Sequence, residues 1–239
     1  MVNKNETLNY FSRPETSNSD LTWLDKYWRP EAFVIDLEAA YRFGSLLDAL
    51  ITEPHLVNYF KYTVAGAQYT KDEFAKAEVM KRAFFSDAFC VSLQKMSHMQ
   101  KVSVKHRFPI SYNGINFFLN VRAKWDFFVE HTDLSGDLKS TACTTQKQFE
   151  ESILHFNYDR QAAWYMDIEN RSNFMFIGVS KVNNKIFKVP VKRDGNLYRS
   201  GREKYQELAF KYWYLFEDLN PAPVMIAEYD RELSATIIQ

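Results

Sequence analysis

A change in hydrophobic periodicity after Lys101 is the strongest constraint that this sequence places on its fold. Before that point, apolar side chains recur with helical spacing over residues 32–51 and 70–99. After it, two segments rich in β-branched and aromatic residues flank Asn113-Gly114, a pair favoured in tight hairpin turns. The chain is therefore expected to begin with helices and to continue with long antiparallel strands.

The remaining segments extend this order. A capping pattern at Ser17 and Asp20 predicts a short helix with Leu21, Leu24 and Trp28 facing inward. Later patterns predict a strand over 135–141, helices over 149–153 and 160–168, two strands in FMFIGVSKV and KIFKVPVK, and a final helix over 198–219. We expect one α/β domain over residues 1–239: a central mixed β-sheet flanked by helices, with a helical part over 1–99 and a catalytic core over 100–219.

Composition excludes several classes of protein. Only 7 of the 239 residues are glycine, and none belongs to a phosphate-binding GxGxxG or GxxxxGK[ST] loop. Cys90 and Cys143 belong to no metal-binding pattern. The 30 basic and 30 acidic residues cancel, so the net charge does not indicate a polyanionic partner. Because no apolar run is long enough to cross a bilayer, we expect a cytoplasmic protein with no membrane partner.

Three charged residues in apolar strand segments are the candidates for chemistry. Asp126 lies in WDFFVE, and Asp137 and Lys139 lie in SGDLKST. Alternate residues of a strand share a face, so Asp137 and Lys139 point the same way, and Asp126 on a neighbouring strand can meet them. Two carboxylates can bind a divalent cation, and a lysine beside them suits a site that hydrolyses phosphodiesters. The alternative is a solvated salt bridge on a strand face.

Longer segments around these residues resemble a known family. The runs RAKWDFF, GDLKSTACTTQKQFEESI and FNYDRQAAWYMD resemble the PD-(D/E)XK nuclease superfamily, and within it exodeoxyribonuclease VIII-like enzymes of phage or prophage type. Upstream, YFSRPETSNSDLTWL and FGSLLDALITEP resemble two further segments of that family. The matches extend from about residue 10 to residue 219. The resemblance implies a restriction-endonuclease-like core.

The resemblance also implies roles for particular residues. Asp126, Asp137 and Lys139 would be catalytic. The metal, Mg²⁺ or Mn²⁺, would be bound by Asp48, Asp126, Asp137 and the backbone carbonyl of Leu138. Gln161 and Tyr165, one helical turn apart, would contact DNA or support the carboxylates; the alternative is a polar residue and a tyrosine on an amphipathic helix.

Two positions depart from the family pattern. Asp48 replaces a histidine on the upstream helix, and Gln100 replaces a glutamate that precedes the first strand of many relatives. A carboxylate can serve as a ligand for a hard cation, whereas a neutral amide is a poorer one. Asp48 could instead have a structural partner. Whether these two residues preserve activity is left open by the sequence.

A local excess of basic residues predicts DNA binding. Between Lys181 and Lys204 there are eight basic and two acidic residues, a net charge of +6. The candidates for phosphate contact are Lys188, Lys192, Arg193, Arg199 and Arg202. Solvated strand and helix faces are the alternative. The resemblance implies double-stranded DNA ends as substrate, a single-strand annealing protein as a partner in recombination, and a homo-oligomer.

We therefore expect a metal-dependent DNA exonuclease acting in recombination. The alternative is a nuclease-fold protein that has lost catalysis and serves as a DNA-binding or recombination-partner module. A third interpretation is an interaction protein that docks another chain through aromatic surface residues.

Overall fold

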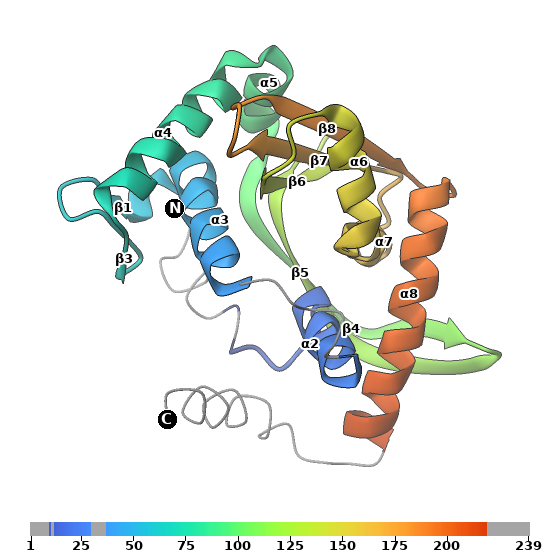
Figure 1. The fold of residues 1–239 in the computed structure, drawn as a ribbon. Coiled ribbons are helices and arrows are strands. Elements are labelled where there is room, and N and C mark those ends of the chain that lie inside the picture. The colour runs from blue at the N-terminus through green and yellow to red at the C-terminus, as the bar shows by residue number, and fades with distance from the viewer. Residues whose placement is uncertain (1–9, 11, 30–36, 219–239) are drawn as a thin grey trace.

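The computed structural model describes residues 10, 12–29 and 37–218, which form three layers. A five-stranded sheet separates helices α3 to α5 from helices α6 to α8 (Figure 1). The expected mixed sheet flanked by helices is confirmed.

The helices of the N-terminal part begin at side-chain caps where the described residues include their first turn. Helix α2 spans Asn18–Trp28, and Ser17 forms the predicted capping box with Asp20. Helix α3 spans Leu37–Thr52, so residues 32–36 of the expected helix lie outside the described residues. Helices α4 (Lys71–Ser86) and α5 (Ala88–Met96) follow.

The sheet has the strand order β4-β5-β6-β7-β8. Strands β4 (His98–Tyr112) and β5 (Ile115–Phe128) form a long hairpin around Asn113-Gly114, where both residues have positive φ as such turns require. Strand β6 (Leu134–Thr141) pairs parallel with β7 (Asn173–Ser180), and β8 (Ile186–Lys192) is the antiparallel edge.

Two helices connect β6 to β7, and one follows β8. Helices α6 (Gln146–His155) and α7 (Tyr158–Ile168) form the crossover that a parallel strand pair needs. Helix α8 (Asn196–Tyr212) continues into a short π-helical segment, η3 (Trp213–Asp218). None of the described helices is long and apolar enough to cross a lipid bilayer.

Two hydrophobic cores cover the two faces of the sheet. The core that we call the α7 core contains side chains from α2, α6, α7 and α8, with Trp125 and Trp164 among its fully buried members. The α3 core contains side chains from α3, α4 and α5, including Leu46 and Phe84. The sheet is therefore buried on both faces, as expected when a parallel pair lies inside it.

Strand β5 changes its side-chain alternation at Asp126. The odd-numbered side chains from Phe117 to Trp125 lie in the α7 core, whereas Phe127 lies in the α3 core and Phe128 in the α7 core. A strand with strict alternation would place all odd-numbered side chains on one face. Asp126 thus lies at the phase change, and its carboxylate contacts Gln100 and the backbone amide of Leu138.

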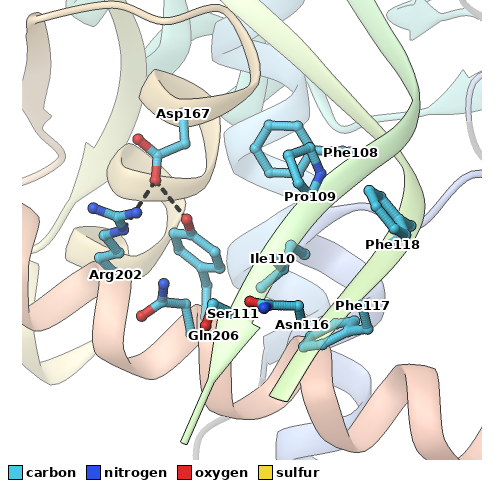
Figure 2. Close-up of a pocket in the computed structure, with 11 residues that line it drawn as sticks. Phe108, Pro109, Ile110, Ser111, Asn116, Phe117, Phe118, Asp167, Arg202 and Gln206 are labelled. Atoms are coloured by element: carbon cyan, nitrogen blue, oxygen red, sulfur yellow. Dashed lines mark hydrogen bonds and ion pairs between the residues drawn. The ribbon is translucent and has the colours of Figure 1, made fainter. Parts of the chain in front are cut away.

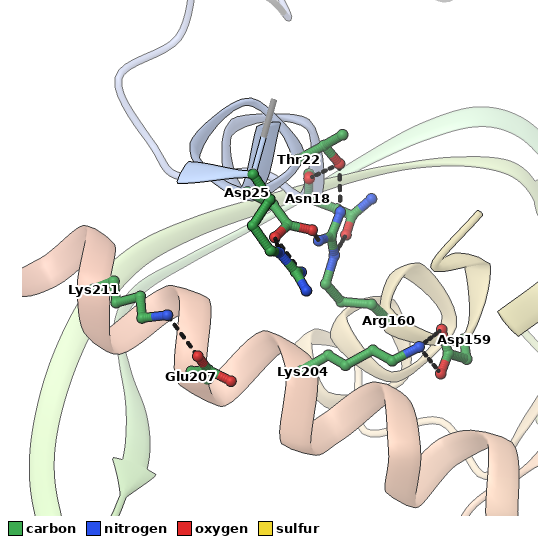
Figure 3. A network of polar contacts seen from close by, with 9 residues as sticks. Asn18, Thr22, Asp25, Asp159, Arg160, Lys204, Glu207 and Lys211 are labelled. Atoms are coloured by element: carbon green, nitrogen blue, oxygen red, sulfur yellow. Dashed lines mark hydrogen bonds and ion pairs between the residues drawn. The ribbon is translucent and has the colours of Figure 1, made fainter. Parts of the chain in front are cut away.

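A buried polar network holds α7 in place (Figure 3). Arg160 reaches α2, where its Nη1 lies 3.4 Å from Oδ2 of Asp25 and its Nε donates to Oδ1 of Asn18 at 3.1 Å. Asp159 is fully buried and accepts from Nζ of Lys204 at 2.8 Å and from Oγ of Ser200 at 2.7 Å on α8. The residues just before Gln161 are therefore tied to two other helices.

Three details differ from the sequence-based expectations. The helical spacing over 70–99 predicted one long helix, and this prediction is wrong. Asp87 ends α4, and its side chain caps α5 by accepting from the amide of Cys90. Trp28 does not face inward: it is 51% exposed, with Lys211 over its ring. The small antiparallel sheet formed by three two-residue strands was not predicted, because such short strands show no alternation; these are β1 (Val57–Asn58), β2 (Thr63–Val64) and β3 (Ala67–Gln68), preceded by the 3-10 turn η2 (Pro54–Leu56).

The close packing of α7 against α8 depends on Gly201. A Cβ atom there would lie 2.0 Å from the backbone oxygen of Asp159, which is rigid. We expect Gly201→Ala to lower the free energy of unfolding by about 3 kcal/mol, since the helices must move apart. Gly44→Ala is the control: its nearest neighbour would be Oγ of Ser140 at 3.7 Å, so it should gain up to about 1 kcal/mol from helix propensity. Urea denaturation measures both, and equal stabilities of the two variants would contradict this account.

Candidate active site

The site lies where β5 and β6 separate. The two strands pair only at Phe127 with Gly136 and at Phe128 with Ser135. Beyond these pairs the backbone amide of Leu138 donates to Oδ2 of Asp126 at 2.7 Å. The carboxylate of Asp126 therefore takes the position of the missing ladder partner.

On the α7 side of this opening, three side chains form a closed cluster. Asp137 and Lys139 point the same way from β6, as predicted, with Oδ2 and Nζ 2.6 Å apart. Gln161 on α7 donates to Oδ1 of Asp137 at 2.6 Å and accepts from Nζ of Lys139 at 2.9 Å. The predicted proximity of Gln161 to the carboxylates is thus observed. Leu138, between the two charged residues, packs into the α3 core.

On the α3 side, a second cluster surrounds the amide of Gln100. Its Nε2 lies 3.1 Å from each carboxylate oxygen of Asp48, 2.8 Å from Oγ1 of Thr52 and 3.4 Å from Oδ1 of Asp126. Thr52 follows Asp48 by one helical turn and its hydroxyl donates to the same carboxylate at 2.9 Å. Asp48 therefore faces the opening between the strands and meets Asp126 through Gln100.

The backbone of Gln100 is strained. Gln100 has a φ of 56°, in the left-handed region that non-glycine residues seldom occupy inside a strand. The register pairs Met99 with Phe127 and Lys101 with Trp125, which places Gln100 opposite Asp126. Such a conformation costs about 1–3 kcal/mol and persists where surrounding contacts enforce it. Here the contacts are those of the side-chain amide.

Burial of the acidic side chains in the opening disfavours their ionised forms. Burial raises the pKa of Asp48 to about 6, despite the opposing effect of the Thr52 hydrogen bond and of Lys124. Burial also raises the pKa of Asp126 well above its ordinary value, and the nearby charges of Asp48 and Asp137 raise it further. A positive charge beside these two carboxylates would favour their ionised forms.

Lys139 keeps its charge. Burial by itself would lower the pKa of Lys139, but the charge and hydrogen bond of Asp137, together with Tyr158 and Asp126, raise the pKa above the ordinary value. The ammonium also lies 4.6 Å from the ring centre of Tyr158. At neutral pH Lys139 is therefore a protonated hydrogen-bond donor and not a proton acceptor.

Tyr165 lies in the α7 core next to the site. It is 8% exposed, and its ring packs 5.1 Å from that of Trp125 in the α7 core. Gln161 lies one turn earlier on α7, close enough to influence the pKa of the Tyr165 hydroxyl. Burial raises the pKa of Tyr165 well above its ordinary value, so the hydroxyl stays neutral. Its position suits a role in orienting Gln161 rather than contact with a large ligand.

The five basic residues predicted to bind DNA have different surroundings. Lys188 pairs with Asp87 at 2.5 Å, and Arg193 and Arg202 both reach Asp167. Lys192 and Arg199 are exposed, and within the described ranges neither forms an ion pair. The structure therefore leaves only these two of the five uncommitted.

A groove of about 520 Å³ lies elsewhere, between the tip of the β4–β5 hairpin and α8 (Figure 2). Phe108 and Phe118 line one wall, and Arg202 and Gln206 the other. Arg202 is its only member among the predicted functional residues. The groove is thus separate from the carboxylate site.

The oxygen donors fit a hard divalent cation. Asp48 and Asp126 offer carboxylates and Thr52 a hydroxyl, all within reach of one point now taken by the Gln100 amide. The carbonyl of Leu138 faces the same strand edge as its amide. Among the residues that the structure describes, no three Asp, Glu, His or Cys side chains lie close enough to share an ion, because Asp137 is held by Lys139 and Gln161. Binding by all three predicted aspartates stays a prediction.

Comparison with known proteins supports the fold. The chain matches no family model and no curated protein sequence. It superposes on the crystal structure of a protein named "Putative exonuclease" from Eubacterium rectale with a TM-score of 0.61 and 15% identity, over 88% of this chain and 85% of that chain. The chain therefore shares the fold of that protein. A phage related exonuclease from Haemophilus somnus 129PT matches with a TM-score of 0.35 and 16% identity, over 73% of this chain and 95% of that chain.

Sequence reasoning missed part of the site. Thr52 was not singled out, although its place one turn after Asp48 on a predicted helix was a usable signal. Lys124, which precedes Asp126 by two residues, was given no role, whereas its Nζ lies 3.6 Å from Glu53. No local pattern indicates that a lysine on β5 meets the end of α3, because the contact depends on how the helix lies on the sheet.

The raised pKa of Asp48 gives a testable pH dependence. The folded protein retains a proton on Asp48 up to about pH 6, whereas the unfolded chain loses it near pH 4. The contribution of protonated Asp48 to the free energy of unfolding is full below pH 4 and is lost as the pH rises through 6. Without added metal, Asp48→Asn should therefore be more stable than the wild type at pH 8, by at most about 3 kcal/mol. The gain should vanish near pH 4.

Thermal unfolding from pH 4 to pH 8 measures this difference. Asp194→Asn removes an exposed carboxylate and serves as the control. A stability difference between Asp48→Asn and the wild type that does not change with pH would contradict the prediction.

Proposed function

We propose that this protein is a metal-dependent deoxyribonuclease. The observation that carries the proposal is the position of Asp126 in the opening between β5 and β6. There it contacts Gln100, which also hydrogen-bonds Asp48, and it lies within electrostatic range of Asp137 and Lys139. Paired acidic oxygens beside a protonated lysine suit hydrolysis of a phosphodiester. The nuclease-like fold agrees with this chemistry.

Each residue has a role that follows from its surroundings. Asp48 and Asp126 would hold the cation, Mg²⁺ or Mn²⁺, together with the carbonyl of Leu138, and Asp137 would join them by exchanging one of its present partners. When bound, that cation supplies Lewis-acid polarisation of the phosphate and a lower pKa for water. Lys139 donates a hydrogen bond and stabilises negative charge that develops on the phosphate oxygens. Gln161 positions Lys139 and Asp137, and Tyr165 positions Gln161.

The finer activity rests on the family resemblance. We propose exonuclease action on duplex ends in recombination, with a homo-oligomeric enzyme and a single-strand annealing partner. The motif segments that support this extend over most of the chain.

A specific observation favours the second candidate, a DNA-binding module without catalysis. The neutral amide of Gln100 occupies the centre of the oxygen cluster. If that amide excludes the cation permanently, the fold would bind DNA without cleaving it.

Cleavage of linear duplex DNA separates the two functions. In Mg²⁺ or Mn²⁺ the wild type should release nucleotides, and a chelator should stop the reaction. Lys139→Ala and Asp137→Asn should each lower the rate about 100-fold or more, because each removes charge stabilisation in the reaction centre. Lys147→Ala, a highly exposed lysine on α6, is the matched control and should keep the wild-type rate. Inert wild type that still binds DNA would favour the non-catalytic module.

The uncommitted basic residues predict the salt dependence of DNA binding. Each phosphate contact contributes about 0.9 to the slope of log affinity against log salt. The double variant with Lys192→Ala and Arg199→Ala should therefore lower that slope by about 2 in fluorescence-anisotropy titrations. Lys147→Ala is again the control, and an unchanged slope in the double variant would remove these residues from the DNA contact.

A further inference from the structure

The amide of Gln100 has more acceptors than protons. A glutamine Nε2 carries two protons, yet four oxygen atoms lie within 3.4 Å of it. Three of them are carboxylate oxygens of Asp48 and Asp126, and the fourth is Oγ1 of Thr52. Two protons cannot serve four oxygens, so the arrangement is better matched to a cation than to an amide.

The amide also draws the two carboxylates together. Asp48 belongs to α3 and Asp126 to β5, and oxygens of both lie within 3.4 Å of the same Nε2, so their charged forms repel each other. The partial positive charge of the amino group offsets part of this repulsion. The strained backbone of Gln100, with φ of 56°, places the amide at this point.

A cation and this amino group cannot share the same oxygens. Oxygen ligands lie about 2.0–2.6 Å from Mg²⁺ or Ca²⁺, so an ion among these oxygens would overlap the space of Nε2. The positive ends of the N–H dipoles would also repel it. Coordination by Asp48 and Asp126 therefore requires the amino group to withdraw.

We propose that the side-chain amide of Gln100 is an internal substitute for the divalent cation, which holds Asp48 and Asp126 together in the metal-free protein and competes with metal for them. The proposal rests on the proposed function, because it assumes that these carboxylates bind the metal. Gln100 thereby sets the metal concentration at which the site fills.

The test compares Mn²⁺ binding by the full chain and its variants. Gln100→Ala removes the amide, and Gln100→Gly removes it while also suiting the left-handed backbone, so at least one variant should fold. Isothermal titration calorimetry at pH 7.5 should give a Kd for Mn²⁺ about tenfold lower in both variants than in the wild type. Gln94→Ala on α5 is the matched control and should keep the wild-type Kd.

Thermal unfolding gives a second readout that does not depend on activity. Without Mn²⁺, Gln100→Ala should unfold at a lower temperature than the wild type, because the carboxylates lose their shared donor. With saturating Mn²⁺, its gain in unfolding temperature should exceed that of the wild type.

The outcomes distinguish this proposal from the proposed function. If the wild type binds Mn²⁺ and cleaves DNA, but the Gln100 variants bind Mn²⁺ equally or more weakly, the substitute role is wrong and the nuclease assignment stands. Weaker binding would make the glutamine a ligand through Oε1. If neither the wild type nor the variants bind Mn²⁺, both proposals fail.

Discussion

The hydrogen bond from the amide of Leu138 to the carboxylate of Asp126 is the contact on which the site depends. Antiparallel strands normally satisfy such an amide with a backbone carbonyl, and the β5–β6 ladder ends after two pairs. A buried amide without a partner would be costly. By accepting that bond, Asp126 allows the strands to separate while its second oxygen faces the opening.

The separation joins two regions that the sheet would otherwise keep apart. Asp48 and Gln100 approach from the side of the α3 core, and Lys139 and Gln161 from the side of the α7 core. Asp126 contacts the first region directly and lies within electrostatic range of the second. One aspartate at a phase change in β5 therefore creates a site with ligands from both layers.

The carboxylates on the α7 side and on the α3 side of the site have different partners. On the α7 side, Asp137 has a full positive charge beside it in Lys139, and the raised pKa of that lysine reflects the pairing. On the α3 side, Asp48 and Asp126 have only an amide between them, and their pKa values are raised mainly by burial. This asymmetry is the reason why the proposed cation is assigned mainly to the α3 side. The buried contacts of Asp159 and Arg160, together with the bare backbone of Gly201, keep α7 and hence Gln161 at the required distance.

The sequence by itself determined the order of the main elements and half of the site. Helical spacing, capping residues and the Asn113-Gly114 turn are local signals, and alternation along a strand brought Asp137 and Lys139 to one face. The exposure of Trp28 was not foreseen, because it depends on Lys211, which is distant in sequence. The break between α4 and α5 was also missed, although Asp87 is a local N-cap residue that accepts from the amide of Cys90. Only the tertiary structure decided that β5 leaves β6, that Gln100 adopts a left-handed backbone, and that Asp48 reaches Asp126 through it. Local periodicity carries no information on where two strands part, since that depends on how the layers pack against each other.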